Sequence, residues 1–463
     1  MKTDTLTAID QVIANENCIG CGACAFADPD AFKINRSEDG HNRARRIGQA
    51  EADISALCPM SGSGEDEDQL AANLWPDLPK DISIGRYREC LAGHVVTDDI
   101  RMRATSGGAI SWVLRELLEQ GHADAVIHVK PADGPLGELF TYAVSESPEA
   151  IMQGAKSRYY PIEMSEILEV LRSSPKRYVV VGLPCFIKTI RLLQRQQVSG
   201  IENVHFCIGL ICGHLKSIYF ADYLATQVGA QSGTIKSFDF RRKLEGRPAS
   251  RYGFAFRADE VKSETVVPMS SVEGGDWGKG LFKNPACEYC DDVVAECADL
   301  VVGDAWLPRY QADWKGTSIL VVRDQTIGSL LAEGRKDGRL VLDDVSVEDV
   351  VASQRSGLFH RRIGLAHRLA RRGKKGQWAP RKRVTPQLAS TVGDRMIFDT
   401  RESIAKKVSA TYAQTVVRGA GLEVFHRRIK PLLFRYRLAF KVRTFMRRIT
   451  PKAKTQTTWP PSS

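Results

Sequence analysis

Short apolar runs alternate with amphipathic segments through the middle of the chain. Apolar positions recur at helical spacing from Ala109 to Gly121, and the apolar run at residues 125–129 behind them predicts a strand. Residues 178–181 form a second apolar run, and a helix is predicted after it over residues 187–194. Because strands that alternate with helices are typical of layered domains, this pattern predicts an open α/β sheet.

The predicted strands end in turns that carry reactive or polar side chains. The strand at residues 178–181 leads to Cys185, and the next predicted strand leads to Cys212. The apolar run at residues 298–302 leads to Asp304. Since open α/β sheets bind ligands outside the carboxyl ends of their strands, we expect these side chains near a ligand site.

Charge divides the chain at about Arg355. From there to the C-terminus, 27 lysines and arginines stand against four acidic residues, whereas the preceding part has 38 basic and 51 acidic residues. All 11 cysteines lie in the acidic part. We therefore interpret the basic part as an appendage that takes no part in the cysteine chemistry.

A first set of cysteines lies near the N-terminus. Cys18, Cys21 and Cys24 form a C-x2-C-x2-C run, with which one loop can supply three of the four thiolates of an iron–sulfur cluster. Cys58, which precedes a proline, can supply the fourth. We predict one four-iron cluster on these four residues. The alternative is a tetrahedral zinc site, although zinc sites favour two separated C-x2-C pairs.

A second set of four cysteines is predicted from two strand ends and one C-x2-C pair. Cys185 and Cys212 follow strands, and Cys287 and Cys290 form a C-x2-C pair, which together make four thiolates and a second cluster. The alternative is that Cys185 and Cys212 are small buried apolar side chains. We assign structural roles to the three cysteines outside the two sets, Cys90, Cys207 and Cys297.

The predicted helix at Ala109 is preceded by the turn Thr105-Ser106-Gly107-Gly108. Such a turn at a helix start leaves backbone N–H groups free to receive an anion. The alternative is an ordinary helix cap with no ligand.

Five motifs occur in the order found in a known family. They are Thr105-Ser-Gly-Gly-Ala, Gly182-Leu-Pro-Cys, Gly209-Leu-Ile-Cys, Cys287-x2-Cys and Gly303-Asp-Ala-Trp. The chain thereby resembles the coenzyme F420 hydrogenase/dehydrogenase beta-subunit family, which includes plant 7-hydroxymethyl chlorophyll a reductase, from about Cys18 to about Leu340. The resemblance implies an FAD enzyme with two 4Fe-4S clusters, in which the Ser-Gly-Gly turn helps to cradle the flavin.

The expected fold class is α/β, in three parts. These are a small 4Fe-4S ferredoxin-like module at residues 1–75, an open α/β domain for flavin and a 4Fe-4S cluster at residues 85–350, and a basic helical C-terminal extension at residues 355–463. The middle domain is divided into residues 85–172 and 175–350.

The expected chemistry follows from what each cofactor does. Clusters pass single electrons and a flavin delivers two, so the chain would take electrons from reduced ferredoxin or a similar one-electron donor to a small-molecule substrate. We expect His214 and Lys156 to protonate the product. The expected cofactor-binding residues are Thr105, Ser106, Gly107, Gly108, Lys156, Arg158 and Asp304. Lys156 and Arg158 could instead contact only flavin phosphates, and Asp304 could simply end a strand.

Other functions are open at this point. The chain could be an electron-carrier subunit of a larger redox complex, without a substrate of its own. Specific nucleic-acid binding is not expected, because the basic extension has no recognition motif. The cysteine content, with no secretory signal or membrane-length apolar span, favours a cytoplasmic protein.

The segment Leu432–Ile449 interleaves aromatic and aliphatic residues with Arg and Lys. Three roles fit this pattern. It could lie peripherally on the inner face of the membrane, pack as a helix on the body of the protein, or dock an acidic electron donor.

Overall fold

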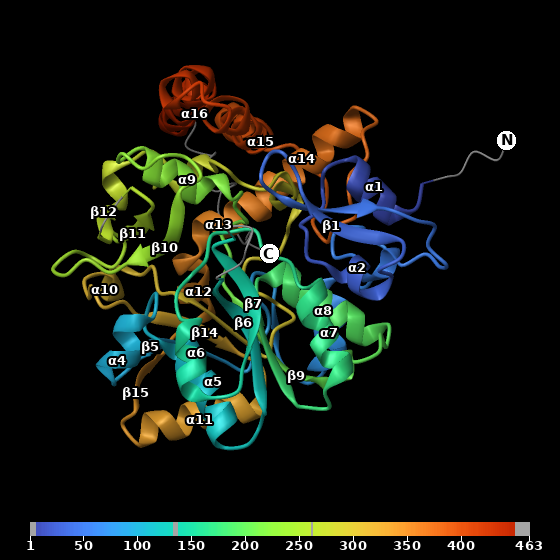
Figure 1. The fold of residues 1–463 in the computed structure, drawn as a ribbon, viewed down its shortest axis with the longest axis vertical. Helices are drawn as coiled ribbons and strands as arrows, with labels where there is room; N and C mark the ends of the chain where they lie inside the picture. Colours follow the sequence, from blue (N-terminus) through green and yellow to red (C-terminus); the bar gives the residue numbers. More distant parts are fainter. Residues whose placement is uncertain (1–5, 133–137, 261–262, 450–463) are drawn as a thin grey trace.

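The computed structural model describes residues 6–132, 138–260 and 263–449. A large mixed sheet lies at the centre, with an N-terminal lobe beside it and the C-terminal helices above a smaller sheet (Figure 1). The prediction of an α/β fold is confirmed.

The central sheet has eight strands in the order β15-β5-β14-β13-β9-β8-β6-β7. The four strands β13, β9, β8 and β6 are mutually parallel, whereas the pairs β15-β5, β5-β14, β14-β13 and β6-β7 are antiparallel. Their bounds are β5 Glu89–Val95, β6 Ala125–Pro131, β7 Phe140–Ser145, β8 Tyr178–Gly182, β9 Val204–Leu210, β13 Leu300–Asp304, β14 Ser318–Val322 and β15 Leu340–Asp344. Each strand expected from the apolar runs is present.

Helices cover both faces of this sheet because its strands are apolar on both sides. In β8, Val179 and Val181 pack on one face and Val180 on the other, as alternation along a strand requires. The helices on the Val179 face are α5 Ala109–Glu119, α6 Pro148–Gln153 and α11 Gln325–Lys336, with the short α4 Asp98–Arg103 before them. Those on the Val180 face are α7 Ser165–Ser173 and α8 Pro184–Arg195.

The N-terminal lobe packs against the same face as α8. Phe26, Leu57 and Leu70 belong to the hydrophobic core that Ile187 of α8 also enters, and a buried ion pair of 3.1 Å joins Lys188 to Glu67. The lobe contains α1 Ala8–Ala14, α2 Ala23–Ala27, β1 Phe32–Arg36, β2 Asn42–Arg46, α3 Glu67–Leu74, β3 Lys80–Asp81 and β4 Gly85–Arg86. Its assignment as a ferredoxin-like module stays a prediction.

A second, antiparallel sheet of three strands lies between the main sheet and the C-terminal helices (Figure 1). Its phenylalanines, among them Phe240 and Phe254, form a core with α9 and the C-terminal helices. The elements are α9 Tyr219–Thr226, β10 Ile235–Arg242, β11 Gly253–Ala258, β12 Thr265–Pro268 and α10 Pro308–Gln311.

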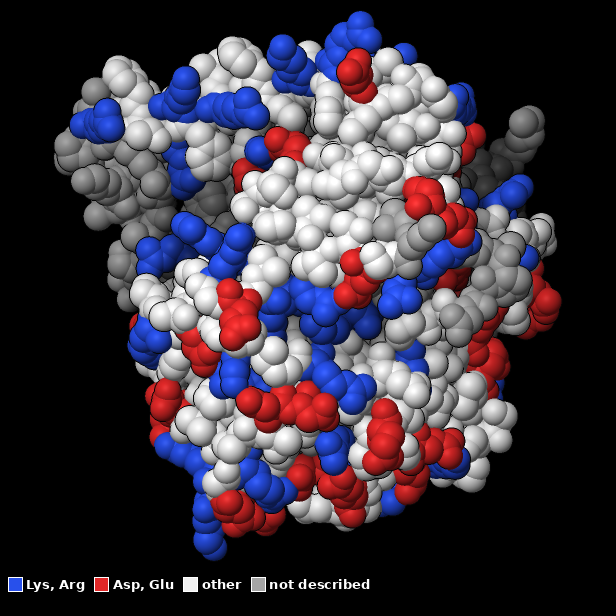
Figure 2. Space-filling view, turned by 60° about the vertical axis from the view of Figure 1, so that its left-hand side comes forward, with Lys and Arg blue, Asp and Glu red and all other residues white. Residues whose placement is uncertain are grey.

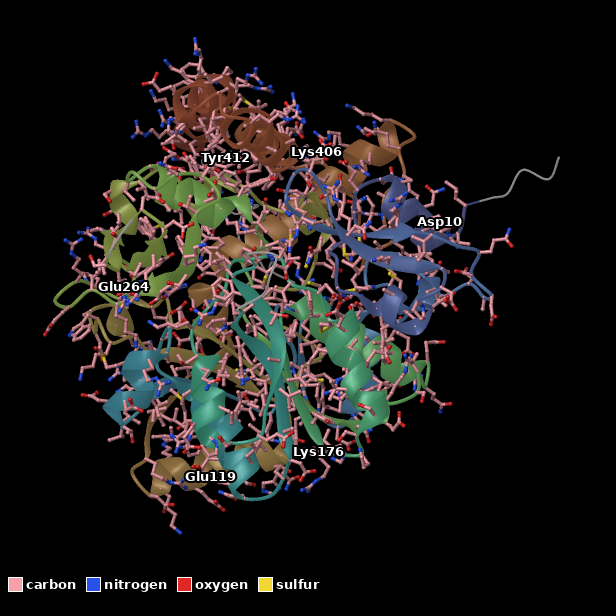
Figure 3. All side chains as sticks on the ribbon, viewed as in Figure 1. Asp10, Glu119, Lys176, Glu264, Lys406 and Tyr412 are labelled. Carbon is pink, nitrogen blue, oxygen red and sulfur yellow. The ribbon has the colours of Figure 1, made fainter. Side chains whose placement is uncertain are left out.

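The basic region is helical, as expected, but its interpretation as an appendage is wrong. Arg368 and Glu288 form a fully buried ion pair of 3.0 Å, and Arg362 reaches Glu296 at 2.9 Å. Tyr412, labelled in Figure 3, donates a hydrogen bond of 2.8 Å to buried Asp222. The helices of this region are α13 Arg355–Arg361, α14 Ile363–Lys374, α15 Val392–Tyr412 and α16 Leu422–Ile449, and α12 Val347–Ser353 precedes them.

Candidate functional site: two cysteine sets beside a cationic cavity

The first cysteine set is built around the start of α2. Gly20 and Gly22 hold φ values of +67° and +94°, which lets the loop turn sharply between the cysteines. A side chain at Gly22 would also meet the backbone nitrogen of Ser165 at 2.6 Å. The backbone N–H groups of Gly20 and Ala44 both donate to the Cys18 thiol at 3.3 Å, so the loop already directs donors at sulfur.

The four thiols of this set are close enough to influence one another. Burial, and then the neighbouring thiols of Cys21 and Cys18, raise the pKa of Cys58 to about 12. Burial, and then the thiols of Cys18, Cys21 and Cys58, raise the pKa of Cys24 well above its usual value. Packing four thiolates into a buried site is unfavourable without a compensating cation, and a bound metal centre supplies one.

The second set also converges, from three separate segments. Cys185 lies in the first turn of α8, directly after β8, and Cys212 follows β9. Cys287 lies in a 3-10 turn at Pro285–Tyr289 and Cys290 follows it. Burial, then the thiols of Cys290, Cys212 and Cys287, raise the pKa of Cys185 well above its usual value.

Helix α8 joins the two sets. The Thr189 hydroxyl, one turn after Cys185, donates to the Cys185 carbonyl at 2.8 Å and also hydrogen-bonds the thiol of Cys21. The pKa of Cys185 is raised in part by Cys21 itself. The sets are therefore direct neighbours. In the part of the chain that the structure describes, no group of three or more His, Cys, Asp or Glu side chains is arranged to hold a metal ion.

One buried arginine from the basic region reaches the second set. Arg361, at the end of α13, donates to the carbonyls of Cys212 and Gly213 at 3.0 and 2.6 Å and to that of Asp292 at 3.0 Å. The four cysteines of the set surround its guanidinium closely enough to raise its pKa. Arg361 is thus a fixed positive charge beside these thiols.

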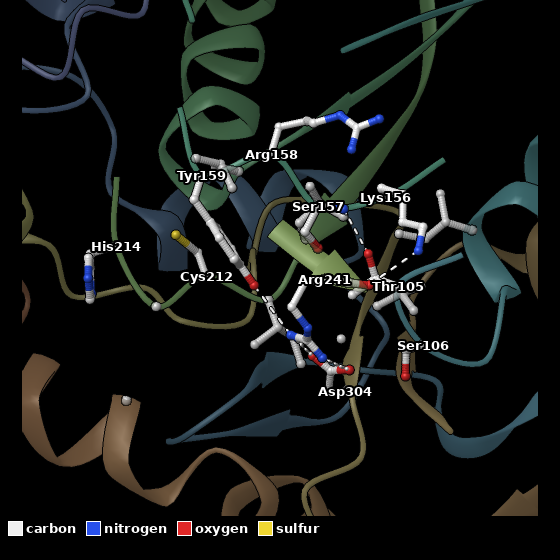
Figure 4. Close-up of a pocket in the computed structure, with 18 of the residues that line it drawn as sticks. Thr105, Ser106, Lys156, Ser157, Arg158, Tyr159, Cys212, His214, Arg241 and Asp304 are labelled. Atoms are coloured by element: carbon white, nitrogen blue, oxygen red, sulfur yellow. Dashed lines mark hydrogen bonds and ion pairs between the residues drawn. The ribbon is translucent and has the colours of Figure 1, made fainter. Parts of the chain in front are cut away.

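A cavity of about 580 Å³ opens next to the second set, which is a usual size for a cofactor or ligand site. Its wall includes Cys212 and Cys287, together with the carboxyl ends of β8, β9 and β13. Figure 4 shows Cys212 and His214 on one side and Thr105, Ser106 and Lys156 on the other. The strand-end position expected for a ligand site is the position observed.

The first turn of α5 faces this cavity. Its N-cap is Gly108, with φ +87°, and no side chain caps the first turn. Ala109 and Ile110 line the cavity with their N–H groups at the positive end of the helix. Thr105 and Ser106 also line it, and their hydroxyl groups bond the Ser157 N–H at 2.7 Å and the Thr317 carbonyl at 2.7 Å.

Gly107 plays a different part from its neighbours, because it lies outside the cavity wall. A side chain there would meet the Gly93 carbonyl oxygen at 2.4 Å and the Ser318 nitrogen at 2.8 Å. Its N–H donates to the Ser318 hydroxyl at 3.1 Å. Gly107 therefore lets the turn sit tightly against β5 and β14. Its contact with a cofactor stays a prediction.

Positive charge dominates the cavity wall. Asp304 is the one acidic residue among the described residues that line it, against seven lysines and arginines, which are Lys156, Arg158, Lys216, Arg241, Lys283, Arg361 and Arg401. Lys216 is fully buried and lies over the rings of Phe220 and Trp277. Burial, then Arg401 and Lys283, hold its pKa well below the usual range. Such a wall favours an anionic ligand.

Five nitrogen atoms of cavity-lining side chains are buried without a hydrogen-bond partner among the described residues. They are Nε2 of His214, Nδ1 of His360, and Nε of Arg158, Arg241 and Arg401. His214 packs against Trp277 with ring centroids 4.7 Å apart. Burial, then nearby lysines and arginines, lower its pKa well below the usual value, so the ring is neutral. These unpartnered nitrogens could bond a molecule in the cavity.

Lys156 and Asp304 already have protein partners. Lys156 lies 3.3 Å from Asp239 and donates to the Arg241 carbonyl at 3.2 Å. Asp304 accepts two hydrogen bonds of 3.0 Å from Arg241, to which the Tyr159 hydroxyl also bonds at 3.3 Å (Figure 4). Asp304 therefore does more than end a strand, since it neutralises a buried arginine of the wall.

Several wall residues lay outside the sequence prediction, notably Arg241, Lys216 and Arg361. Arg241 lies on β10, a strand that the apolar pattern does not single out. The one available signal was charge, because the acidic residues of the first 354 positions need partners that the basic region can supply. The charge pattern does not indicate which basic residue contacts which acidic residue.

Two family models match adjacent segments of the chain. The N-terminal model of coenzyme F420 hydrogenase/dehydrogenase beta subunits matches residues 90–169, and the C-terminal model matches residues 175–348. Together they span more than half of the chain. The matched ranges contain the turn before α5 and all four cysteines of the second set.

Two curated proteins are similar to more than half of this chain. Coenzyme F420 hydrogenase subunit beta of Methanosarcina barkeri is 22% identical over 264 residues, covering 56% of this chain and 82% of that protein. The subunit of the same name from Methanothermobacter thermautotrophicus is 18% identical over 271 residues, covering 58% and 87%.

Among solved structures, a chain of the F420-reducing [NiFe] hydrogenase complex from Methanosarcina barkeri, studied with xenon, is similar to this one. The TM-score is 0.48 at 18% identity, with 68% of this chain and all of that chain covered.

Proposed function

The chain belongs to the coenzyme F420 hydrogenase/dehydrogenase beta-subunit family, and on that premise we propose that it is an iron–sulfur flavoprotein oxidoreductase that works as a subunit of a redox complex. The two curated relatives carry the name of a hydrogenase subunit, which supports a protein partner as the source or acceptor of electrons. The observation that carries the proposal is the cavity whose wall includes both Cys212 and the open first turn of α5.

The cysteine sets fit two four-iron clusters. Cys18, Cys21, Cys24 and Cys58 would hold one cluster, and Cys185, Cys212, Cys287 and Cys290 would hold the other. The cysteines of both sets are buried or half-buried and mutually close, and backbone N–H groups donate to sulfur at Cys18 and Cys287. Thr189 of α8 lies between the sets, since its hydroxyl contacts both Cys185 and Cys21.

The cavity fits an anionic, planar cofactor such as FAD. The uncapped start of α5 offers N–H groups for phosphate oxygens, and the surplus of lysine and arginine compensates the charge. The unpartnered Nε of Arg158 and Nε2 of His214 are two of the hydrogen-bonding sites that the wall offers to a bound molecule. Clusters supply single electrons and a flavin supplies a hydride, which is the chemistry these groups would bring when bound.

The residues of this chain would then position the reactants and manage the proton. His214 is neutral and its Nε2 is free to bond a group in the cavity, so it is our candidate for the proton-transferring residue. Lys156 is held by Asp239, which suits a role in charge compensation better than proton transfer. Trp277, packed on His214, limits the access of water to that side.

The remaining choice is between a subunit with its own substrate and a subunit that only carries electrons. A cavity of this size, open to groups beyond the cysteines, favours a bound cofactor and an acceptor next to it. The acceptor is a small molecule or a partner subunit, and F420 is one substrate to test because the relatives are named for it.

Anaerobic purification of the full chain, followed by iron, sulfide and flavin analysis, tests the proposal. The dithionite-reduced protein is then mixed with oxidised acceptors, F420 and artificial dyes included. Turnover with bound flavin supports an enzyme; clusters without flavin support the pure carrier. Cys287→Ala should remove one cluster, while the matched control Cys207→Ala, a buried cysteine outside both sets, should keep the full iron content.

A further inference from the structure

Helix α16 packs on the body along one side. Phe425, Ile429, Tyr436 and Ala439 are buried in the core that the small sheet shares with α15. Arg443 fixes the same side through an ion pair of 2.8 Å with Asp394 on α15. These contacts fix which face of α16 points away from the protein.

The outward face carries a stripe of large apolar side chains. Phe434 and Phe445 are 64% and 61% exposed, and Leu438 is 41% exposed. Spacings of four and seven residues place the three on one side of a helix with 3.6 residues per turn. Every exposed phenylalanine among the described residues lies in α16, so this surface is unlike the rest of the protein.

Basic side chains flank the stripe. Glu423 is the only acidic residue of the sequence Leu422–Ile449, which holds nine lysines and arginines. Figure 2 shows Lys and Arg set among uncharged side chains along the upper edge of the molecule, where α16 lies. The exposed basic residues of the helix are Arg427, Arg428, Lys430, Arg435, Arg437, Lys441 and Arg448.

We propose that this face of α16 docks the protein on an anionic lipid surface. The apolar stripe would enter the boundary between head groups and acyl chains, and the basic residues on its sides would meet anionic head groups. A peripheral position is what the helix allows, since no helix in the described ranges is long and apolar enough to cross a bilayer. The inference is independent of the proposed redox function.

Two other occupants explain less of the surface. Nucleic acid or an acidic protein would account for the basic residues through charge alone. Neither of these partners accounts for three large apolar side chains in a row between the charges, which gain most from an apolar medium. An apolar stripe flanked by basic side chains therefore favours an anionic lipid surface over either of these partners.

The test is co-sedimentation of the full-length protein with vesicles. Phosphatidylcholine vesicles are compared with vesicles that also contain phosphatidylglycerol. We expect binding to the anionic vesicles only, weakened by salt. Phe434→Ser with Phe445→Ser should lower the partition coefficient by about tenfold or more, because the apolar contribution is lost. Lys430→Glu with Lys441→Glu should have a similar effect.

A matched control changes an exposed apolar and an exposed basic residue elsewhere. Val341→Ser with Lys336→Glu, on β15 and α11, should leave binding unchanged. Unchanged iron content and thermal unfolding show that each variant is folded. The proposal is overturned by equal binding to neutral vesicles, by no binding, or by an unaltered partition coefficient in the α16 variants. Binding of DNA or an acidic ferredoxin by this face, without lipid binding, also overturns it.

Discussion

Arg361 offers the sharpest test of how the basic region acts on the second cysteine set. Its guanidinium bonds the carbonyls of Cys212, Gly213 and Asp292, and it is only 5% exposed. A fixed positive charge in such a place stabilises the more negative, reduced form of a bound cluster. We predict that Arg361→Gln makes the second cluster harder to reduce.

The size of the effect follows from Coulomb's law. With ~6 Å between the guanidinium and the cluster and an effective dielectric constant of ~20, the removed interaction is about 3 kcal/mol per electron. At 1.4 kcal/mol per factor of ten, the reduction equilibrium changes by roughly a hundredfold. The substitution also leaves carbonyls unpaired, each of which costs about 1–3 kcal/mol of stability.

The assay is a redox titration followed by electron paramagnetic resonance, with iron content measured first. Arg361→Lys is the matched control because it keeps the charge but loses the forked geometry. The first cluster is an internal reference, since the cysteines that raise the pKa of Arg361 most belong to the second set. An unchanged second potential in Arg361→Gln, or equal shifts in both variants, would refute the electrostatic argument.

Three further predictions follow from buried groups. Asp304→Asn leaves Arg241 buried without its carboxylate and should lower the free energy of unfolding by about 3–5 kcal/mol, measured by urea titration. Burial lowers the pKa of His128 to about 4 in the folded protein. Between about pH 4 and 6.5 the unfolded state therefore binds more protons than the folded state, and the free energy of unfolding falls on acidification by up to about 3 kcal/mol. His128→Asn should flatten this pH dependence of unfolding, and an unchanged slope would contradict it. Gly107→Val should lower both the melting temperature and flavin content, because its side chain would meet the Gly93 carbonyl; loss of flavin at an unchanged melting temperature would show that Gly107 contacts the cofactor instead.

The main sheet and its strand-end cysteines could be predicted because the responsible patterns are local. Residues 178–181 and 298–302 are apolar runs of strand length, and parallel strands bring their carboxyl ends to one edge. That rule alone brings Cys185 and Cys212 together. The pair at Cys287 then completes the set through its spacing.

The contribution of the basic region could not be read in this way. Arg361 reaches the carbonyl of Cys212 across 149 positions of sequence, and no local pattern encodes such a contact. The sequence shows the contrast between an acidic and a basic part. The structure explains it through buried ion pairs between the two parts, such as Arg368 with Glu288. Gly107 gives the same lesson on a small scale, because sequence does not tell which side of a turn faces the cavity.

The central claim is that two buried cysteine sets and one cationic cavity form a single redox site. The most direct measurement is the cofactor content of the anaerobically purified full chain. We predict about eight iron and eight sulfide per chain, from two four-iron clusters, together with about one flavin. A reconstituted protein that never exceeds about four iron, or that binds both clusters but no flavin, would contradict the account.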